Sequence, residues 1–411
     1  MRHVPGGLTS PPAAGSAQDA HEPFKARVDS IDLVRGVIMI LMALDHVRDY
    51  FGAAGVDPTD PATTTGALFF TRWITHICAP VFFLLTGVSA FLVSQRRSTR
   101  DLSQYLLTRG LWLILLEVTV MRCLAWQFNF DYQVTMLTVL WALGASMVLL
   151  SGLVWLPVGA VGAVAVTVIA GHNLLDRLPA SALGSLAPLV AVLHAPSVVF
   201  SNGTHVVFSA YPLVPWVAVV AAGYALGPVF LWESGRRQAF LVRLGLTLTI
   251  AYVLLRIANV YGDPRPWMAH DSVFRSALAF LNTTKYPPSL LFLLMTLGPA
   301  MLVLAAVERR TPAWLRPAVT FGRVPLFYFV LHAVVIHVFA VIVCYMRYGD
   351  AHWMFESPTL AQFPVTQPPG WPVGLPGVYL VWLCVVATLF PLCRWFAEVK
   401  RRRRDWWLSY M

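Results

Sequence analysis

The feature that most constrains the fold is a succession of long apolar segments. A helix needs about 20 apolar residues to cross the hydrocarbon core of a bilayer. Ten stretches have roughly this length, at residues 33–51, 73–93, 105–125, 134–153, 157–171, 212–231, 240–260, 288–307, 324–346 and 377–396. Hydrophobic residues make up 57% of the chain and charged residues 12%, which excludes an ordinary soluble globular protein. The sequence therefore predicts an all-α, polytopic helical membrane protein with ten transmembrane helices.

A further apolar stretch, Leu186 to Phe200, does not fit this scheme. It is short, and Pro188 and Pro196 interrupt it. A re-entrant or interfacial segment is the preferred interpretation, because non-helical backbone at membrane depth has to be buried in protein. An eleventh span is the alternative.

The basic residues predict the orientation of the spans. Short cytoplasmic loops of membrane proteins carry an excess of Lys and Arg. With ten spans, the basic clusters all fall on the side that holds both chain ends, at Lys25, Arg27, Arg96, Arg97, Arg100, Arg109, Arg236, Arg237, Arg309, Arg310, Arg316, Arg323 and Lys400 to Arg404. We therefore expect both termini inside, and we do not read the net charge of +10 as a sign of nucleic-acid binding.

The expected organisation is a membrane domain between two tails. Residues 1–28 are rich in Pro, Gly, Ala and Ser and resemble a disordered cytoplasmic tail, not a signal peptide. The membrane domain covers 29–398, and 399–411 form a basic cytoplasmic tail. The five cysteines show no metal-binding spacing, and HExxH, CxxC, Walker and GxSxG patterns are absent from the sequence. We expect no metal.

The first apolar segment carries charges at both ends. At 3.6 residues per turn, one face of a helix through it holds Arg35, Met39, Met42, His46 and Asp49. Arg35 and His46 are ~16 Å apart along the axis, about half the hydrocarbon thickness. Ionisable groups at such depths usually have a function, although the residues from Asp45 to Asp49 could also cap the helix at the interface.

Other spans also contain polar groups on the side expected to be outside. Arg72 and His76 are four residues apart, and Lys285 and Tyr286 begin a later span. His332 follows Tyr328 by one turn, whereas His337 points away from His332 and is better explained by a hydrogen bond between helices. Arg72 and Lys285 could instead extend to the membrane interface.

Five phrases of the sequence, in this order, carry a family resemblance. They are SIDLVRGVIMILMALDHVRDYF, FFTRWITHICAPVFFLLTGVSAFL, YPLVPWVAVVAAGYALG, KYPPSLLFLLMTLG and FGRVPLFYFVLHAVVIH. They resemble a bacterial family of integral membrane proteins that is similar to the catalytic domain of heparan-α-glucosaminide N-acetyltransferase. The resemblance extends over residues 27–397, and it places the chain in a bacterial cytoplasmic membrane.

The resemblance implies transfer of an acyl group, acetyl above all, across the membrane from cytoplasmic acyl-CoA to a sugar or other small acceptor outside. His46 or His76 is then the general base, oriented by Asp45 or Asp49, and Arg35, Arg109 and Arg323 bind the CoA phosphates. Arg72, Lys285, Tyr286 and His332 are expected on the acceptor side.

One departure from the animal enzymes matters for the choice of base. Their catalytic histidine lies in the loop after the first helix, whereas the corresponding loop here, Gly52 to Thr71, contains no histidine. His46 occupies the position of an asparagine in those enzymes. Heparan sulfate is not the expected acceptor, and the sequence leaves open both the acceptor and a homo-oligomeric state.

Two other functions remain open at this point. A proton-coupled transporter or flippase could use the same Asp, His and Glu residues as a proton relay. A structural membrane subunit would tolerate the loss of His46 and His76.

Overall fold

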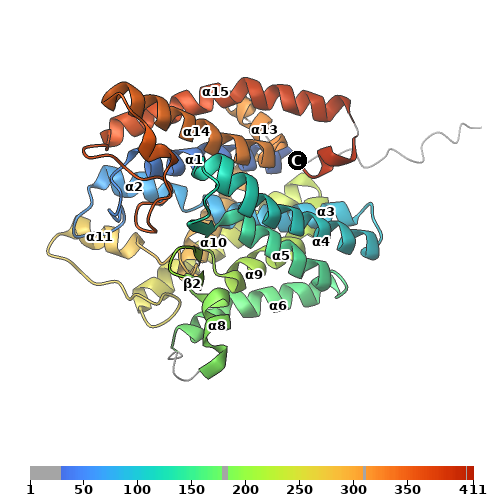
Figure 1. Cartoon of the computed structure of the whole chain (residues 1–411). Helices are drawn as coiled ribbons and strands as arrows, with labels where there is room; N and C mark the ends of the chain where they lie inside the picture. Colours follow the sequence, from blue (N-terminus) through green and yellow to red (C-terminus); the bar gives the residue numbers. More distant parts are fainter. Residues whose placement is uncertain (1–28, 178–183, 309–311, 404) are drawn as a thin grey trace, which may run out of the picture.

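The computed structural model describes residues 29–177, 184–308, 312–403 and 405–411, which form a bundle of helices (Figure 1). The predicted tail 1–28 and the basic residues Arg309, Arg310 and Arg404 lie outside the described residues. Each predicted span contains a helix. These helices are α1 (Asp29–Phe51), α3 (Cys78–Ser94), α4 (Thr99–Leu116), α5 (Val139–Leu153), α6 (Val158–Gly171), α9 (Leu213–Leu226), α10 (Ser234–Ala258), α12 (Leu290–Val307), α14 (Pro325–Tyr348) and α15 (Gly374–Arg402).

The chain is an integral membrane protein by the length and composition of these helices. In the described part of the chain, seven helical stretches are long and apolar enough to cross a membrane. They are Gly66–Ser94, Val158–Arg177, Leu213–Leu231, Ser234–Ala258, Leu290–Val307, Pro325–Tyr348 and Gly374–Arg402. Helix α1 has the length of a span, but its charged residues, among them Arg35 and Asp45, keep it out of this group. The structure therefore supports a polytopic helical fold without fixing all ten spans.

Shorter elements join the long helices. They are α2 (Gly66–Thr75), a π-helix (Glu117–Trp126), α8 (Ala187–His194), α11 (Val273–Leu281), α13 (Arg316–Arg323), and 3-10 helices at His172–Arg177, Gly184–Leu186, Gly227–Leu231, Ala313–Leu315, His352–Phe355 and Trp406–Ser409. The strands β1 (Val134–Leu137), β2 (Ser197–Ser201) and β3 (Val206–Ser209) form a small sheet in the order β1-β3-β2. β1 pairs with β3 in parallel, and β2 pairs with β3 antiparallel, with an irregularity between Val198 and Phe200.

The sheet corrects two predictions. Residues 134–137, expected to begin a span, form β1 because their backbone pairs with β3. The alternative that Leu186 to Phe200 forms an eleventh span is wrong, since α8 has only 8 residues and β2 follows it. Ala195 is extended at φ −134°, as expected for a residue before a proline, so Pro196 separates the helix from the strand.

Helix α1 is the central element of the bundle, since it packs against α2, α3, α12, α13, α14 and α15. Its approach to α13 depends on two glycines. A Cβ atom at Gly36 would lie 1.8 Å from the carbonyl oxygen of Ala318, and one at Gly322 would lie 1.8 Å from that of Asp32. This packing surrounds the polar residues of α1 with other helices.

The two ends of the bundle differ in what they carry. The C-terminus lies at one end, and α2 and α11 lie at the opposite end (Figure 1). In the predicted orientation, the first end faces the cytoplasm. The outer end of α1 is held by the loop before α15, because Trp371 Nε1 donates to the carbonyl of Tyr50 at 2.7 Å and Val373 N to that of Phe51 at 3.1 Å.

Candidate functional site

At the outer end of α1, two arginines hold two carboxylates. Arg48 Nη2 donates to Asp45 Oδ1 at 3.0 Å and to Asp49 Oδ1 at 2.6 Å. Arg72 Nη1 donates to the other oxygen of Asp45 and so links α2 to α1. The side chains of Asp45, Arg48 and Arg72 are only 11–13% exposed. These ion pairs compensate for the cost of burying charges.

His46 pairs with another histidine, not with a carboxylate. Its Nδ1 lies 2.6 Å from Nε2 of His332 on α14, and the two rings are stacked with centroids 4.9 Å apart. His332 is fully buried, and its Nδ1 lies 3.1 Å from the carbonyl oxygen of Tyr328. His46 is half-buried. The hydrogen-bond partner of His46 is therefore a residue of a distant helix, and the expected role of Asp45 or Asp49 in orienting it stays a prediction.

The π-helix places an aromatic side chain against this histidine pair. Trp126, its last residue, stands edge-on to His46 with ring centroids 5.0 Å apart. Tyr50 Oη contacts the carbonyl oxygens of Ala125 at 3.1 Å and Trp126 at 2.8 Å, so it can satisfy a carbonyl that the helix end leaves free. His337 also contacts Ala125 O, at 3.2 Å, and Met354 O, at 2.7 Å, which agrees with the structural role expected for it.

Lys285, Tyr286 and His76 complete the outer group. His76 lies between α2 and α3, is 3% exposed and packs against Phe292. Lys285 is 9% exposed, with its Nζ 5.2 Å from the centre of the Tyr286 ring. The charge of Lys285 acts on Asp45, His46 and His76, so these side chains share one electrostatic environment.

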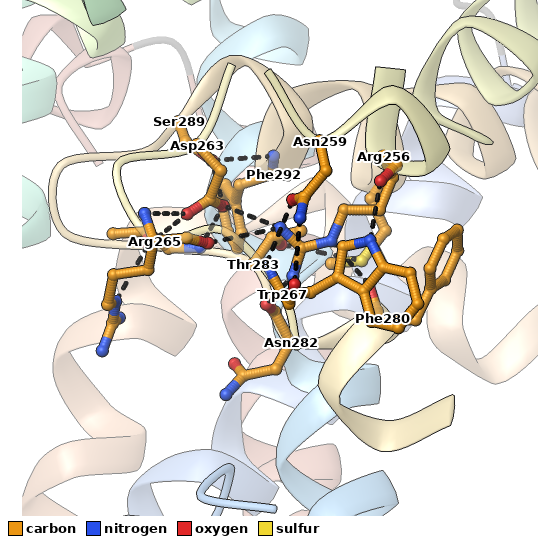
Figure 2. Close-up of polar contacts among 12 residues, drawn as sticks. Arg256, Asn259, Asp263, Arg265, Trp267, Phe280, Asn282, Thr283, Ser289 and Phe292 are labelled. Carbon is orange, nitrogen blue, oxygen red and sulfur yellow. Dashed lines mark hydrogen bonds and ion pairs between the residues drawn. The ribbon is translucent and has the colours of Figure 1, made fainter. Parts of the chain in front are cut away.

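A polar network holds the loop that carries Lys285 (Figure 2). The guanidinium group of Arg256 donates to the carbonyl oxygens of Ala279 at 3.0 Å, Phe280 at 2.9 Å and Asn282 at 2.6 Å. Asp263 accepts from Thr284 N at 2.8 Å and from Ser289 Oγ at 3.0 Å. This network was not predicted from the sequence, although a charged residue inside the predicted span 240–260 was a signal for it.

The other end of the α1 stripe opens into an inner pocket. Arg35 and Arg109 line a pocket of about 140 Å³ together with Thr86, Ser89 and Tyr105. Arg35 Nη2 donates to Ser89 Oγ at 2.7 Å, and Arg109 Nη1 donates to Tyr105 Oη at 3.1 Å. Tyr105 also borders an open cleft of about 390 Å³, whose other residues are Arg97, Asp101, Gln104, Thr108 and Tyr410.

The structure thus divides the predicted site residues into two groups. The outer group contains Asp45, His46, Asp49, Arg72, His76, Lys285, Tyr286 and His332. Arg35 and Arg109 belong to the inner pocket. Arg323 lines neither the pocket nor the cleft, because its half-exposed side chain extends toward Asp29 at 4.0 Å. The chemical roles of all these residues stay predictions.

Comparison with known proteins gives one family match. The model of the family described as heparan-alpha-glucosaminide N-acetyltransferase, catalytic, matches residues 27–257, which is more than half of the chain. No curated protein matches. The matched range includes His46, His76 and the inner arginines, and it ends before Lys285 and His332.

Proposed function

Because the chain belongs to the family of the heparan-alpha-glucosaminide N-acetyltransferase catalytic domain, we propose that it is a membrane-embedded acyltransferase. It moves an acyl group, acetyl above all, from cytoplasmic acyl-CoA to a sugar or other small acceptor on the outer side. The membrane in question is a bacterial cytoplasmic membrane with both chain ends inside.

The position of two polar half-sites on one helix supports this proposal most. Arg35 borders the inner pocket, and His46 belongs to the outer group. They are eleven positions apart on the helix, a distance of ~16 Å along its axis. An extended acyl-pantetheine arm spans a distance of this order, so a donor bound from the inside can present its thioester to an acceptor outside.

The donor binds through its phosphates on the inner side. Arginine suits phosphate because its planar guanidinium group donates two parallel hydrogen bonds. Arg35 and Arg109 therefore hold the pantetheine phosphate end, and Arg97 in the adjoining cleft takes the nucleotide. Tyr105 connects the two spaces, since Arg97 lies 4.5 Å from the centre of its ring.

The acceptor reacts on the outer side. His46 takes the proton from the acceptor amine or hydroxyl as a general base. The acceptor atom forms a bond to the thioester carbonyl carbon, the carbon–sulfur bond breaks, and the leaving CoA thiolate receives the proton from His46. Lys285, Arg72 and Tyr286 bind the acceptor beside this histidine.

Ligand binding and transfer by the purified protein test the proposal. Acetyl-CoA is expected to raise the thermal unfolding midpoint, and Arg35→Ala is expected to weaken this effect. Transfer from labelled acetyl-CoA to glucosamine, used as the probe acceptor, is expected to disappear in His46→Ala with the fold intact. If acetyl-CoA stabilises the protein no more than AMP does, the proposal is wrong.

A proton-coupled transporter or flippase is the second candidate. The observation in its favour is a cluster of ionisable groups at the outer end of α1. Asp45 contacts both Arg48 and Arg72, and the charges of all three act on His46. Uptake of a labelled sugar into proteoliposomes that requires a pH gradient and no acyl donor would decide for this function.

A further inference from the structure

We propose that His332 is a positioning residue that fixes the tautomer of His46, so that two histidines and one peptide carbonyl work as a single unit. This inference rests on the proposed function, because it takes His46 as the general base. It differs from the expectation from sequence, in which a carboxylate orients His46 and His332 contacts the acceptor.

The proton positions follow from the contacts, starting at the carbonyl. The oxygen of Tyr328 can only accept a hydrogen bond, so Nδ1 of His332, 3.1 Å away, carries the hydrogen. Nε2 of a neutral His332 then has a lone pair. It accepts from Nδ1 of His46 at 2.6 Å, which therefore also carries a hydrogen. The remaining lone pair of His46 is on Nε2.

This tautomer leaves the base nitrogen of His46 available. Within the described residues, Nδ1 of His46 has a hydrogen-bond partner and Nε2 has none. A general base needs its lone pair on the nitrogen that faces the acceptor. The opposite tautomer would place a hydrogen there and abolish proton abstraction.

This role of His332 depends on its being neutral, and the packing favours this form. His332 is fully buried, with the rings of Tyr328 and Phe329 each 5.5 Å from its own ring, centre to centre. Burying an unpaired charge among aromatic rings is costly. The neighbouring carboxylates do not supply a counter-charge by direct contact, because Asp45 and Asp49 bind Arg48 and Arg72.

The surrounding elements hold the rings of His46 and His332 in position relative to each other. Helices α1 and α14 pack directly against each other. Tyr328 stands one turn before His332 with its ring nearly parallel, at an interplanar angle of 8°. Trp126 approaches both histidines edge-on. Among the described residues, the charged and titratable groups around the pair include Asp45, Arg48, Asp49, Tyr50, Arg72, His76, Cys78, Lys285 and Tyr328.

His332 acts by holding the proton on Nδ1 of His46 while Nε2 takes up the acceptor proton. The imidazolium that forms keeps its Nδ1–H bond to His332. When the CoA thiolate takes the proton from Nε2, the pair returns to its starting state. No proton has to pass through His332, which is why we call it a positioning residue.

Three variants of α14 test this role. His332→Phe keeps a planar ring but has no acceptor, and we expect kcat to fall roughly 100-fold with an unchanged KM for acetyl-CoA. His332→Gln offers a side-chain oxygen as acceptor, and we expect it to recover most of this loss. His337→Gln is the control, because among the described residues the ring nitrogens of His337 contact only backbone carbonyl oxygens.

Nitrogen-15 NMR of histidine-labelled protein gives a readout that does not depend on activity. His46 is expected as the Nδ1–H tautomer in the wild type and as a mixture in His332→Phe. The positioning role is wrong if His332→Phe leaves kcat unchanged or if wild-type His46 carries its hydrogen on Nε2. In either case, loss of transfer in His46→Ala would leave the proposed function standing. If His332→Phe does not fold, the tautomer of wild-type His46 and the transfer rate of His332→Gln decide whether His332 has this role.

Discussion

Arg256 and Lys285 are both cationic side chains buried around the loop between α10 and α12, but their surroundings differ. Arg256 is 1% exposed and donates to three backbone carbonyl oxygens at 2.6–3.0 Å. Lys285 is 9% exposed, and its closest recorded contact in the described structure is the ring of Tyr286, 5.2 Å away. Arg256 stabilises the loop through its hydrogen bonds, whereas Lys285 is held in place by the loop.

The network around Arg256 and the group around His46 also differ in how many of their buried polar atoms have hydrogen-bond partners. Among the described residues labelled in Figure 2, no buried side-chain nitrogen or oxygen lacks a hydrogen-bond partner. Around His46, four such atoms of described residues lack one, namely Arg48 Nε, His76 Nδ1, Trp126 Nε1 and Tyr328 Oη. Buried polar groups are normally satisfied, and a cluster of unsatisfied ones is consistent with a site for a ligand or for chemistry. The loop network is structural, and the group around His46 is the candidate site.

The largest expected effect is on stability, when the network around Arg256 is broken. Arg256→Met removes the guanidinium group from the carbonyls of Ala279, Phe280 and Asn282 and from Asp263, 3.9 Å away. We expect the free energy of unfolding to fall by about 3–5 kcal/mol. Thermal unfolding in detergent measures this change. Arg243→Met on the exposed face of the same helix is the control, and equal midpoints for the two variants would contradict a structural role.

The second prediction concerns Lys285. Lys285→Met removes a buried ammonium group without breaking an ion pair recorded for the described residues. We expect acyl transfer to fall about tenfold while the free energy of unfolding stays constant or rises by up to about 1 kcal/mol. Initial rates and thermal unfolding of one preparation give both values. A loss of stability as large as that of Arg256→Met would remove the distinction between the two cations.

Tyr50→Phe removes a hydroxyl group that has hydrogen-bond partners at the edge of the site. The hydroxyl group contacts the carbonyl oxygens of Ala125 and Trp126, and its loss should cost about 1 kcal/mol of unfolding free energy. Chemical denaturation measures the change, with Tyr348→Phe as a control, since that hydroxyl binds the exposed carbonyl of Pro369. Equal effects of the two changes would show that the π-helix end does not need Tyr50.

The smallest expected effect is that of His76→Leu. Nδ1 of His76 is buried and has no hydrogen-bond partner within the described structure, so a bound acceptor that displaces the neighbouring side chains would give it one. We expect the KM for the acceptor to rise roughly threefold, the value of one hydrogen bond, with kcat and stability unchanged. A loss of kcat as large as that of His46→Ala would make His76 the general base.

The sequence alone determined the class of protein. Apolar segments of membrane-spanning length predict helices wherever they occur, because a bilayer leaves backbone groups no other partners. Each of the predicted segments contains a helix, and the stripe from Arg35 to His46 follows directly from helical geometry. Charges inside predicted spans also indicated most members of the outer group, since such charges are costly.

The tertiary structure decided which partner each polar group has. The sequence suggested Asp45 or Asp49 as the partner of His46, since they are its neighbours in the chain, but these carboxylates bind arginines. The partner is His332, 286 residues away on α14. The strand at 134–137 and the network of Arg256 likewise depend on contacts between distant segments. Periodicity fixes the face on which a residue lies, whereas its hydrogen bonds depend on which helices pack together, and a single sequence does not specify that packing.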